Sequence, residues 1–253
     1  MTLIPILLES APRAALDARA LGTLATIVLV LALLHLGLPR FRGWLERKER
    51  LVGSVGGGLM SAYVFLHLLP ELDEGQAVIG RSIYGIALLG FLLFDGIERW
   101  AWTRTKDAEP EARRKASFPH RVVLAAGYNF LILYSLPEAI YDSYLVVYLM
   151  LLTFVLHLVH VADSLSGLDE HAYDRWGRHV LVLGLVAGAA LHAAAPPSLR
   201  VVNVSTALLS GSILFTVFKE QLGEYEKTSY RMYLGGVLAY FCILRGLLPY
   251  LGS

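Results

Sequence analysis

Apolar runs of about 20 residues recur along this chain, and they constrain its fold more than any other feature. Each run is long enough to cross a hydrocarbon core of about 30 Å as an α-helix. The sequence is 56% hydrophobic and 17% charged, whereas an ordinary soluble domain is about 45–50% apolar and about 25% charged. A membrane β-barrel would instead show alternating segments of about ten residues. The sequence therefore predicts an all-α integral membrane protein.

Polar or proline-containing segments divide the apolar residues into eight expected spans. These lie at about 20–38, 51–70, 77–100, 121–141, 143–164, 179–195, 200–220 and 230–250. Residues 1–19 mix apolar and charged residues, so we expect a flexible or interfacial lead-in. The stretches at 103–120 and 167–179 are expected to be polar loops. No separate soluble domain is expected, so residues 1–253 form a single membrane domain.

The basic residues orient the expected spans. If the N-terminus lies outside, 17 of the 22 Lys and Arg residues fall in inner loops or at inner span ends, and 5 fall on the outer side. Cytoplasmic loops of membrane proteins carry the excess of Lys and Arg. Because the expected number of spans is even, the sequence predicts that both termini lie outside.

Polar side chains interrupt the fourth and fifth expected spans. They are Asn129, Glu138, His157, His160 and Asp163. Such groups are costly in hydrocarbon and normally face a bundle interior, where they mark an ion path, a metal site or a structural contact. Positions three apart share a helix face, so the two imidazoles project together and the carboxylate follows one turn later. This donor set suits zinc or another divalent ion; interhelical hydrogen bonding is the structural alternative.

Two motifs outside these spans resemble the ZIP family of zinc and iron permeases. The second span ends in HLLPE (His67–Glu71), and the third ends in FLLFDGIER at residues 91–99. In outline the resemblance covers residues 20 to 250. It implies an eight-transmembrane-helix bundle with both termini outside. It also implies a transport site with a His-Asn-x-x-(Asp/Glu)-Gly motif on span four and a His-Glu-x-x-Glu-like motif on span five.

The transport motifs are degenerate here and allow two registers. In the first, Tyr128-Asn129 takes the His-Asn position, Ile132 replaces the acid, and His157 opens the span-five motif. At 1.5 Å rise per residue, Asn129 and His157 then lie at about the same depth. In the second register Glu138 supplies the acid, but the His and Gly of the motif are lost. Both registers remain open at this stage.

The function expected from the resemblance is transport or binding of a divalent metal ion, zinc before others, moving through the helix 4/5 hairpin toward the cytosol. His67 and Glu71 are candidates for an outer entry path. Expected partners are the metal ion and the lipid bilayer of a bacterial inner membrane, with a homodimer left open. No nucleic acid, organic cofactor or catalytic activity is expected. The alternatives are an intramembrane zinc-dependent hydrolase, or a ZIP-like fold that has lost metal transport.

Overall fold

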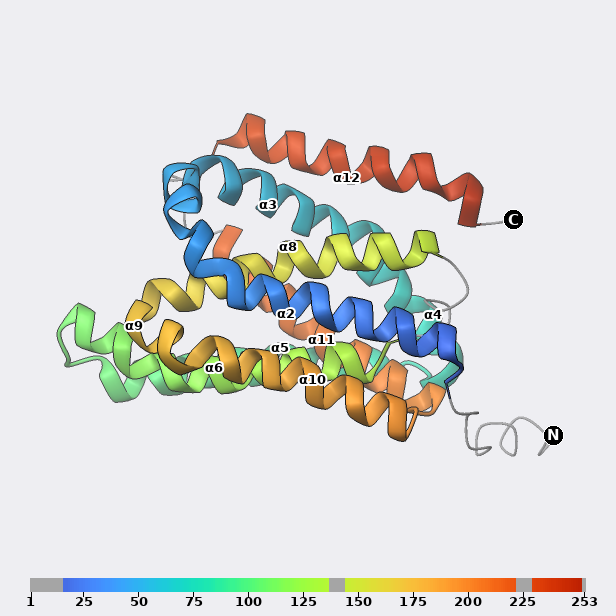
Figure 1. Cartoon of the computed structure of the whole chain (residues 1–253), viewed down its shortest axis with the longest axis horizontal. Helices are drawn as coiled ribbons and strands as arrows, with labels where there is room; N and C mark the ends of the chain where they lie inside the picture. The colour runs from blue at the N-terminus through green and yellow to red at the C-terminus, as the bar shows by residue number, and fades with distance from the viewer. Residues whose placement is uncertain (1–15, 137–143, 222–228, 252–253) are drawn as a thin grey trace.

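The computed structural model describes residues 16–136, 144–221 and 229–251, and every regular element within them is helical (Figure 1). The elements are α2 (Ala18–Arg47), α3 (Glu49–Tyr63), the π-helix η1 (Val64–Leu68), α4 (Leu69–Ile79), α5 (Ser82–Thr105), α6 (Pro110–Tyr134), α8 (Tyr144–Leu168), α9 (Glu170–Ala172), the π-helix η2 (Tyr173–Gly177), α10 (Arg178–Ala194), α11 (Leu199–Gln221) and α12 (Tyr230–Leu251).

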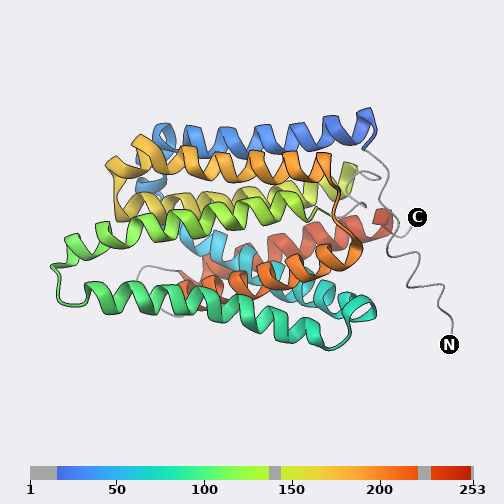
Figure 2. The same ribbon diagram turned by 90° about the horizontal axis from the view of Figure 1, so that it is seen from below.

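The helices form two bundles that lie one above the other in Figure 2. In the first bundle, α2 packs against α8 and α10, and α6 packs against the same two helices. In the second bundle, α12 packs along α3, while α11 packs along α5 and α4. Contacts of α6 with α5 and α11, and of α8 with α3, join the two bundles. The chain therefore passes from one bundle to the other several times.

Glycines bring α5 and α11 of the second bundle into backbone contact. A Cβ atom placed on Gly90 would lie 2.2 Å from the carbonyl oxygen of Leu208, and one on Gly211 would lie 1.8 Å from that of Ala87. Each glycine thus meets the carbonyl three residues before the partner's glycine. Small residues permit this approach in membranes, where packing rather than the hydrophobic effect drives helix association.

The same reciprocal contact joins α3 and α12. A Cβ atom on Gly58 would lie 2.1 Å from the oxygen of Tyr233, and one on Gly236 would lie 2.3 Å from that of Val55. The offset of three residues is identical to that in the α5–α11 pair. The two helix pairs of the second bundle are therefore built on one packing pattern.

Several helix contacts follow an internal exchange of the two ends of the chain; the α5–α6 contact is an exception, because no comparable contact joins α12 and α8 among the described residues. In this exchange α2 is swapped with α10, the α3–α4 segment with α11, α5 with α12, and α6 with α8. The α2–α8 contact then corresponds to the α10–α6 contact. The same exchange turns α5–α11 into α12–α3, and α3–α8 into α11–α6. This pattern is that of a repeated three-helix unit on either side of the α6–α8 hairpin.

Among the described residues, four continuous helices are long and apolar enough to cross a membrane. They are Ala18–Trp44, Arg50–Ile79, Glu170–Ala194 and Leu199–Lys219. An all-α membrane protein is therefore supported. The other four expected spans fall on α5, α6, α8 and α12.

Three expected boundaries are wrong. The stretch 103–120, expected as a loop, is mostly helical, because α6 begins at Pro110, where a proline fits the first turn. The stretch 167–179 is also mostly helical, since the Asp169 carboxylate accepts from the Ala172 N–H at 2.9 Å and starts α9. The second helix does not end near residue 70; it runs to Ile79, and Gly80 follows with φ 66°.

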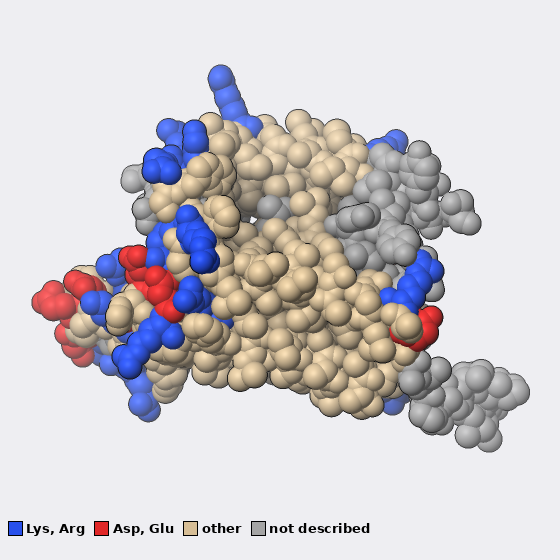
Figure 3. Space-filling view, in the orientation of Figure 1, with Lys and Arg blue, Asp and Glu red and all other residues tan. Residues whose placement is uncertain are grey.

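Charge divides the molecule into two unlike ends. Most Lys and Arg side chains gather at the end that holds α9 and the α5–α6 connection (Figure 3). We call this the basic end. Helix α2 begins and α12 ends at the opposite end (Figure 1). The long sides between the two ends carry few charges in this view.

Candidate functional site between the two bundles

A histidine and an asparagine meet in the interior of the first bundle. Asn129 of α6 is 1% exposed and His35 of α2 is fully buried. The Asn129 Nδ2 lies 3.1 Å from His35 Nε2, and it also donates to the carbonyl oxygen of Leu181 in α10 at 3.2 Å. One amide therefore links three helices.

This pair retains unused hydrogen-bonding atoms. The His35 Nδ1 and the Asn129 Oδ1 are both buried and have no hydrogen-bond partner among the described residues. An unpaired buried polar atom costs about 1–3 kcal/mol. The His–Asn pair is thus a place in the first bundle where a small polar ligand, a water or an ion would gain hydrogen bonds.

Close packing of α6 on α10 positions the amide. A Cβ atom on Gly184 or on Gly188 would lie 2.3 Å from a carbonyl oxygen of α6, that of Ala126 or Phe130 respectively. These two carbonyls flank Asn129 in sequence. The two glycines, one helical turn apart, therefore let the α6 backbone reach α10 at the depth of Asn129.

Tyr128 separates two pockets between the bundles. We call the pocket nearer the end opposite the basic end the outer pocket, and the one nearer the basic end the inner pocket. The outer pocket has a volume of about 50 Å³ and is lined by Tyr63, Glu71, Ile132 and Tyr128, with residues of α8 and α11. The inner pocket has about 100 Å³ and is lined by Tyr128 with residues of α5, α8 and α11. A single water needs about 10–15 Å³, so each pocket has room for a few waters. The Tyr128 side chain, packed edge-on against Phe94, borders both.

The outer pocket reaches the predicted entry residues. His67 Nε2 lies 3.9 Å from the Glu71 carboxylate, and the His67 ring stacks on Tyr63. His67 belongs to η1, which ends at Leu68, two residues before Pro70 of α4. Because proline lacks an N–H and clashes with the carbonyl four residues earlier, a local widening of the helix there is expected. The structure brings His67 and Glu71 together at the end opposite the basic end.

The inner pocket ends in a cluster of three charges. Glu98 of α5 accepts from Arg121 of α6 at 2.5 Å and from Lys219 of α11 at 2.6 Å. Its side chain is 19% exposed. Arg121 belongs to the first bundle and the other two to the second, so the cluster ties the bundles together near the basic end.

Of the other predicted ligands, the structure describes the side chains of His160 and Asp163. His160 is half-buried in α8 and Asp163 is exposed there. Asp163 lines a cavity of about 490 Å³ at the basic end, together with Arg42 and Lys115. Glu138 lies outside the described residues, and of His157 the structure describes the α8 backbone but not the side chain. Among the described residues, no group of three or more His, Cys, Asp or Glu could hold a metal ion.

Residues of α8 and α6 that line the same pocket show which parts of the two helices lie at the same depth. Phe154 lines the outer pocket with Ile132, and Val161 lines the inner pocket with Leu124. The helix position 157 therefore lies at about the depth of Asn129, midway between these two levels. This is the arrangement that the first register predicts for the backbone.

Sequence reasoning missed His35. The residue stands in the middle of the apolar run LALLHLGLP of the first span. A titratable side chain there is a functional or structural signal by itself. The sequence carries this signal, but no spacing connects His35 to the motifs on spans four and five.

No protein-family model, curated protein or solved structure matches the chain. The resemblance to ZIP permeases therefore depends on the sequence motifs quoted above and stays a prediction.

Proposed function

We propose that the protein is a membrane transporter for a divalent metal ion, zinc before others, which moves along the interface of the two bundles toward the basic end. The exchange of helix contacts and the repeated glycine pattern support a transporter. Transporter folds are commonly built from internal repeats, with the substrate site near the membrane midplane where the repeats meet. In this proposal the chain crosses the membrane eight times, and both ends lie outside.

The observation that carries the proposal is the pair of pockets on either side of Tyr128. They lie in line between the bundles, and one carboxylate stands at each far end, Glu71 at the outer and Glu98 at the inner. A transporter needs a route that is interrupted near its middle, so that the substrate is never exposed to both sides at once. Tyr128 interrupts this route at the depth of the His35–Asn129 pair.

The proposed ligands lie at and below this depth. Asn129 and His157 hold the ion at the centre, with His35 as the neighbour that can release the amide for ion binding. His160 and Asp163 receive the ion toward the basic end. In the second register, Glu138 supplies a carboxylate. Nitrogen and oxygen donors of this kind suit zinc, and carboxylates are needed because a buried dication must be compensated.

Electrostatics gives the two ends different roles. The outer end carries three acidic residues on α4, which are Glu71, Asp73 and Glu74. They attract a cation to the outer mouth. At the inner end, Arg121 and Lys219 leave the cluster around Glu98 with one net positive charge, which repels a cation. Release of the ion at the basic end therefore requires that one of these two cations leave Glu98.

Zinc uptake into liposomes tests the proposal. Purified wild-type protein is expected to load an internal zinc-sensitive dye, and Asn129→Leu and His157→Ala are each expected to lower the initial rate at least tenfold. The matched control is His171→Ala, because His171 is an exposed histidine of α9. This variant is expected to keep the wild-type rate. Wild-type uptake no faster than in empty liposomes would contradict the proposal, as would equal rates in all four proteins.

A further inference from the structure

A long apolar groove runs between α5, α6 and α11. Its volume is about 710 Å³, within the range of about 300–1,000 Å³ typical of small-molecule sites. The groove lies beside the inner pocket, but it faces the periphery of the helix bundle and not its interior. Leu93 and Val123, which line it, are 51% and 66% exposed. It is therefore open toward the surroundings of the bundle, which in a membrane are lipid.

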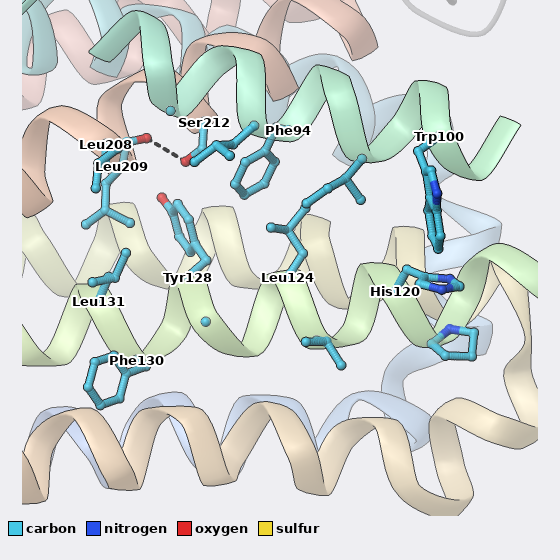
Figure 4. A pocket seen from close by; sticks show the side chains of 16 residues that line it. Phe94, Trp100, His120, Leu124, Tyr128, Phe130, Leu131, Leu208, Leu209 and Ser212 are labelled. Atoms are coloured by element: carbon cyan, nitrogen blue, oxygen red, sulfur yellow. Dashed lines mark hydrogen bonds between the residues drawn. The ribbon is translucent and has the colours of Figure 1, made fainter. Parts of the chain in front are cut away.

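The lining is nearly all hydrocarbon. Its side chains come mainly from Leu, Val, Ile and Phe (Figure 4). The Ser212 hydroxyl donates to the carbonyl oxygen of Leu209 at 2.7 Å, so it is satisfied within its own helix. A polar ligand would find few partners in the groove, whereas a hydrocarbon chain would gain contact along its whole length.

The length of the groove matches one leaflet. On α5 it extends from Gly90 to Trp100, and on α6 from Pro119 to Leu131. Ten residues of helix span about 15 Å, which is half of a hydrocarbon core of about 30 Å. The groove thus runs from the middle of the expected membrane to its surface on the side of the basic end.

The surface end of the groove has the features of a headgroup site. Trp100 and His120 point toward each other there (Figure 4), with ring centroids 4.6 Å apart. Tryptophan favours the membrane–water interface. The exposed Arg104 guanidinium lies 4.7 Å above the Trp100 ring. In such a stacked pose the edge of a guanidinium can still donate to a phosphate.

We propose that this groove binds one acyl chain of a phospholipid from the leaflet at the basic end, and that Arg104 contacts the phosphate of an anionic headgroup. Apolar lining, a length of one leaflet and a cation at the surface end together fit this one occupant. The groove shares the side chains of Phe94 and Tyr128 with the proposed ion route but opens to the outside of the bundle, and lipid binding does not depend on metal transport. A bound lipid would fill the space between α5 of one bundle and α6 of the other.

Gly127 provides the test, because it lines the groove and nothing lies within 4 Å of a Cβ atom placed there. Gly127→Leu therefore fills the groove without a backbone clash. Gly96→Leu is the matched control, since Gly96 on α5 also has open space around its Cβ but does not line the groove. The full-length proteins are reconstituted in vesicles of equal parts phosphatidylglycerol and phosphatidylcholine, extracted in mild detergent, and examined by native mass spectrometry.

Wild type and Gly96→Leu are expected to retain one phospholipid per chain, enriched in phosphatidylglycerol, and Gly127→Leu is expected to lose it. Arg104→Gln is expected to keep a lipid but to lose the headgroup preference. Equal lipid retention by wild type and Gly127→Leu would overturn the proposal. So would a lipid-free wild type, or a wild-type dimer that Gly127→Leu converts to monomer, which would make the occupant a second copy of the chain.

Discussion

The two bundles each hold four long helical segments in the described part of the chain, but they bury polar side chains differently. In the second bundle, Ser210 and Ser212 each donate to a carbonyl of their own helix α11, at 2.7 Å in both cases. In the first bundle, the Asn129 amide donates to a carbonyl of α10, and His192 Nδ1 lies 2.7 Å from a carbonyl oxygen of α6. The contacts of Asn129 and His192 thus cross between helices, whereas those of the two α11 serines stay within one helix.

This difference indicates which bundle can bind a ligand. A serine bonded to its own helix keeps its partner when neighbouring helices shift. An amide or imidazole bonded across helices loses its partner, and a buried polar group without one is costly. A ligand can then supply the missing contact. Glycine–carbonyl packing occurs in both bundles, so it is the buried polar contacts between helices that favour the first bundle as the binding part and the second bundle as a frame.

Replacing a contact glycine of the second bundle is expected to have the largest effect. Gly211→Leu would force side-chain atoms into the Ala87 carbonyl, since even a Cβ atom would lie 1.8 Å away. Overpacking of this kind costs about 1–3 kcal/mol and sometimes more, and we expect the upper end because backbone must move. Thermal unfolding in detergent measures the effect. Gly235→Leu, at an open position of α12, is the control; equal melting temperatures would show that the frame is not tightly packed.

Breaking the polar contact of the first bundle is expected to have an intermediate effect. Asn129→Leu leaves His35 Nε2 and a carbonyl of α10 without the amide, which should cost about 1–3 kcal/mol. The double variant His35→Leu/Asn129→Leu should recover part of this loss, because it removes the stranded imidazole as well. Ser210→Ala is the comparison from the second bundle and should cost less. A cost for Ser210→Ala equal to that for Asn129→Leu would remove the distinction between the bundles.

Loosening the connection between the bundles is expected to have the smallest effect on stability. Glu98→Gln weakens both ionic contacts of Glu98, and for a partly exposed group we expect about 1 kcal/mol. It should also make the inner pocket more accessible to a water-soluble thiol reagent at a cysteine placed at Thr216, which lines that pocket. Glu111→Gln, whose partner Lys115 lies on the same helix, should change neither property. An unchanged labelling rate in Glu98→Gln would mean that the cluster does not close the inner end.

Apolar run length predicts most of the fold because a helix that crosses hydrocarbon needs a fixed number of residues. Among the described residues, each expected span falls mainly on a helix, although the third begins on α4 before the turn at Gly80. The prediction of polar loops at 103–120 and 167–179 is wrong, because hydropathy marks where the membrane ends and not where a helix ends. Local signals, Pro110 at a helix start and Asp169 as a cap, decide the helix boundaries there.

The candidate site was harder to predict. Spacing on α8 indicates which side chains share a face, but not which neighbour they face: His160 is half-buried and Asp163 is exposed near the basic end. The partner of Asn129 is His35, 94 residues away, and no local pattern connects them. The pairing is set by packing of α2 and α10 around α6, which depends on glycines whose contacts appear only in three dimensions.

The central claim is that a divalent ion passes between the two bundles, which must separate at the inner end. Cysteines in place of Glu98 and Arg121, in a Cys242→Ser background, join α5 to α6 through a reducible thiol cross-linker. Zinc uptake into liposomes is then measured before and after reduction. The account predicts uptake at the level of empty liposomes while cross-linked, recovery on reduction, and no response in either single-cysteine variant. Undiminished uptake by the cross-linked protein would contradict it.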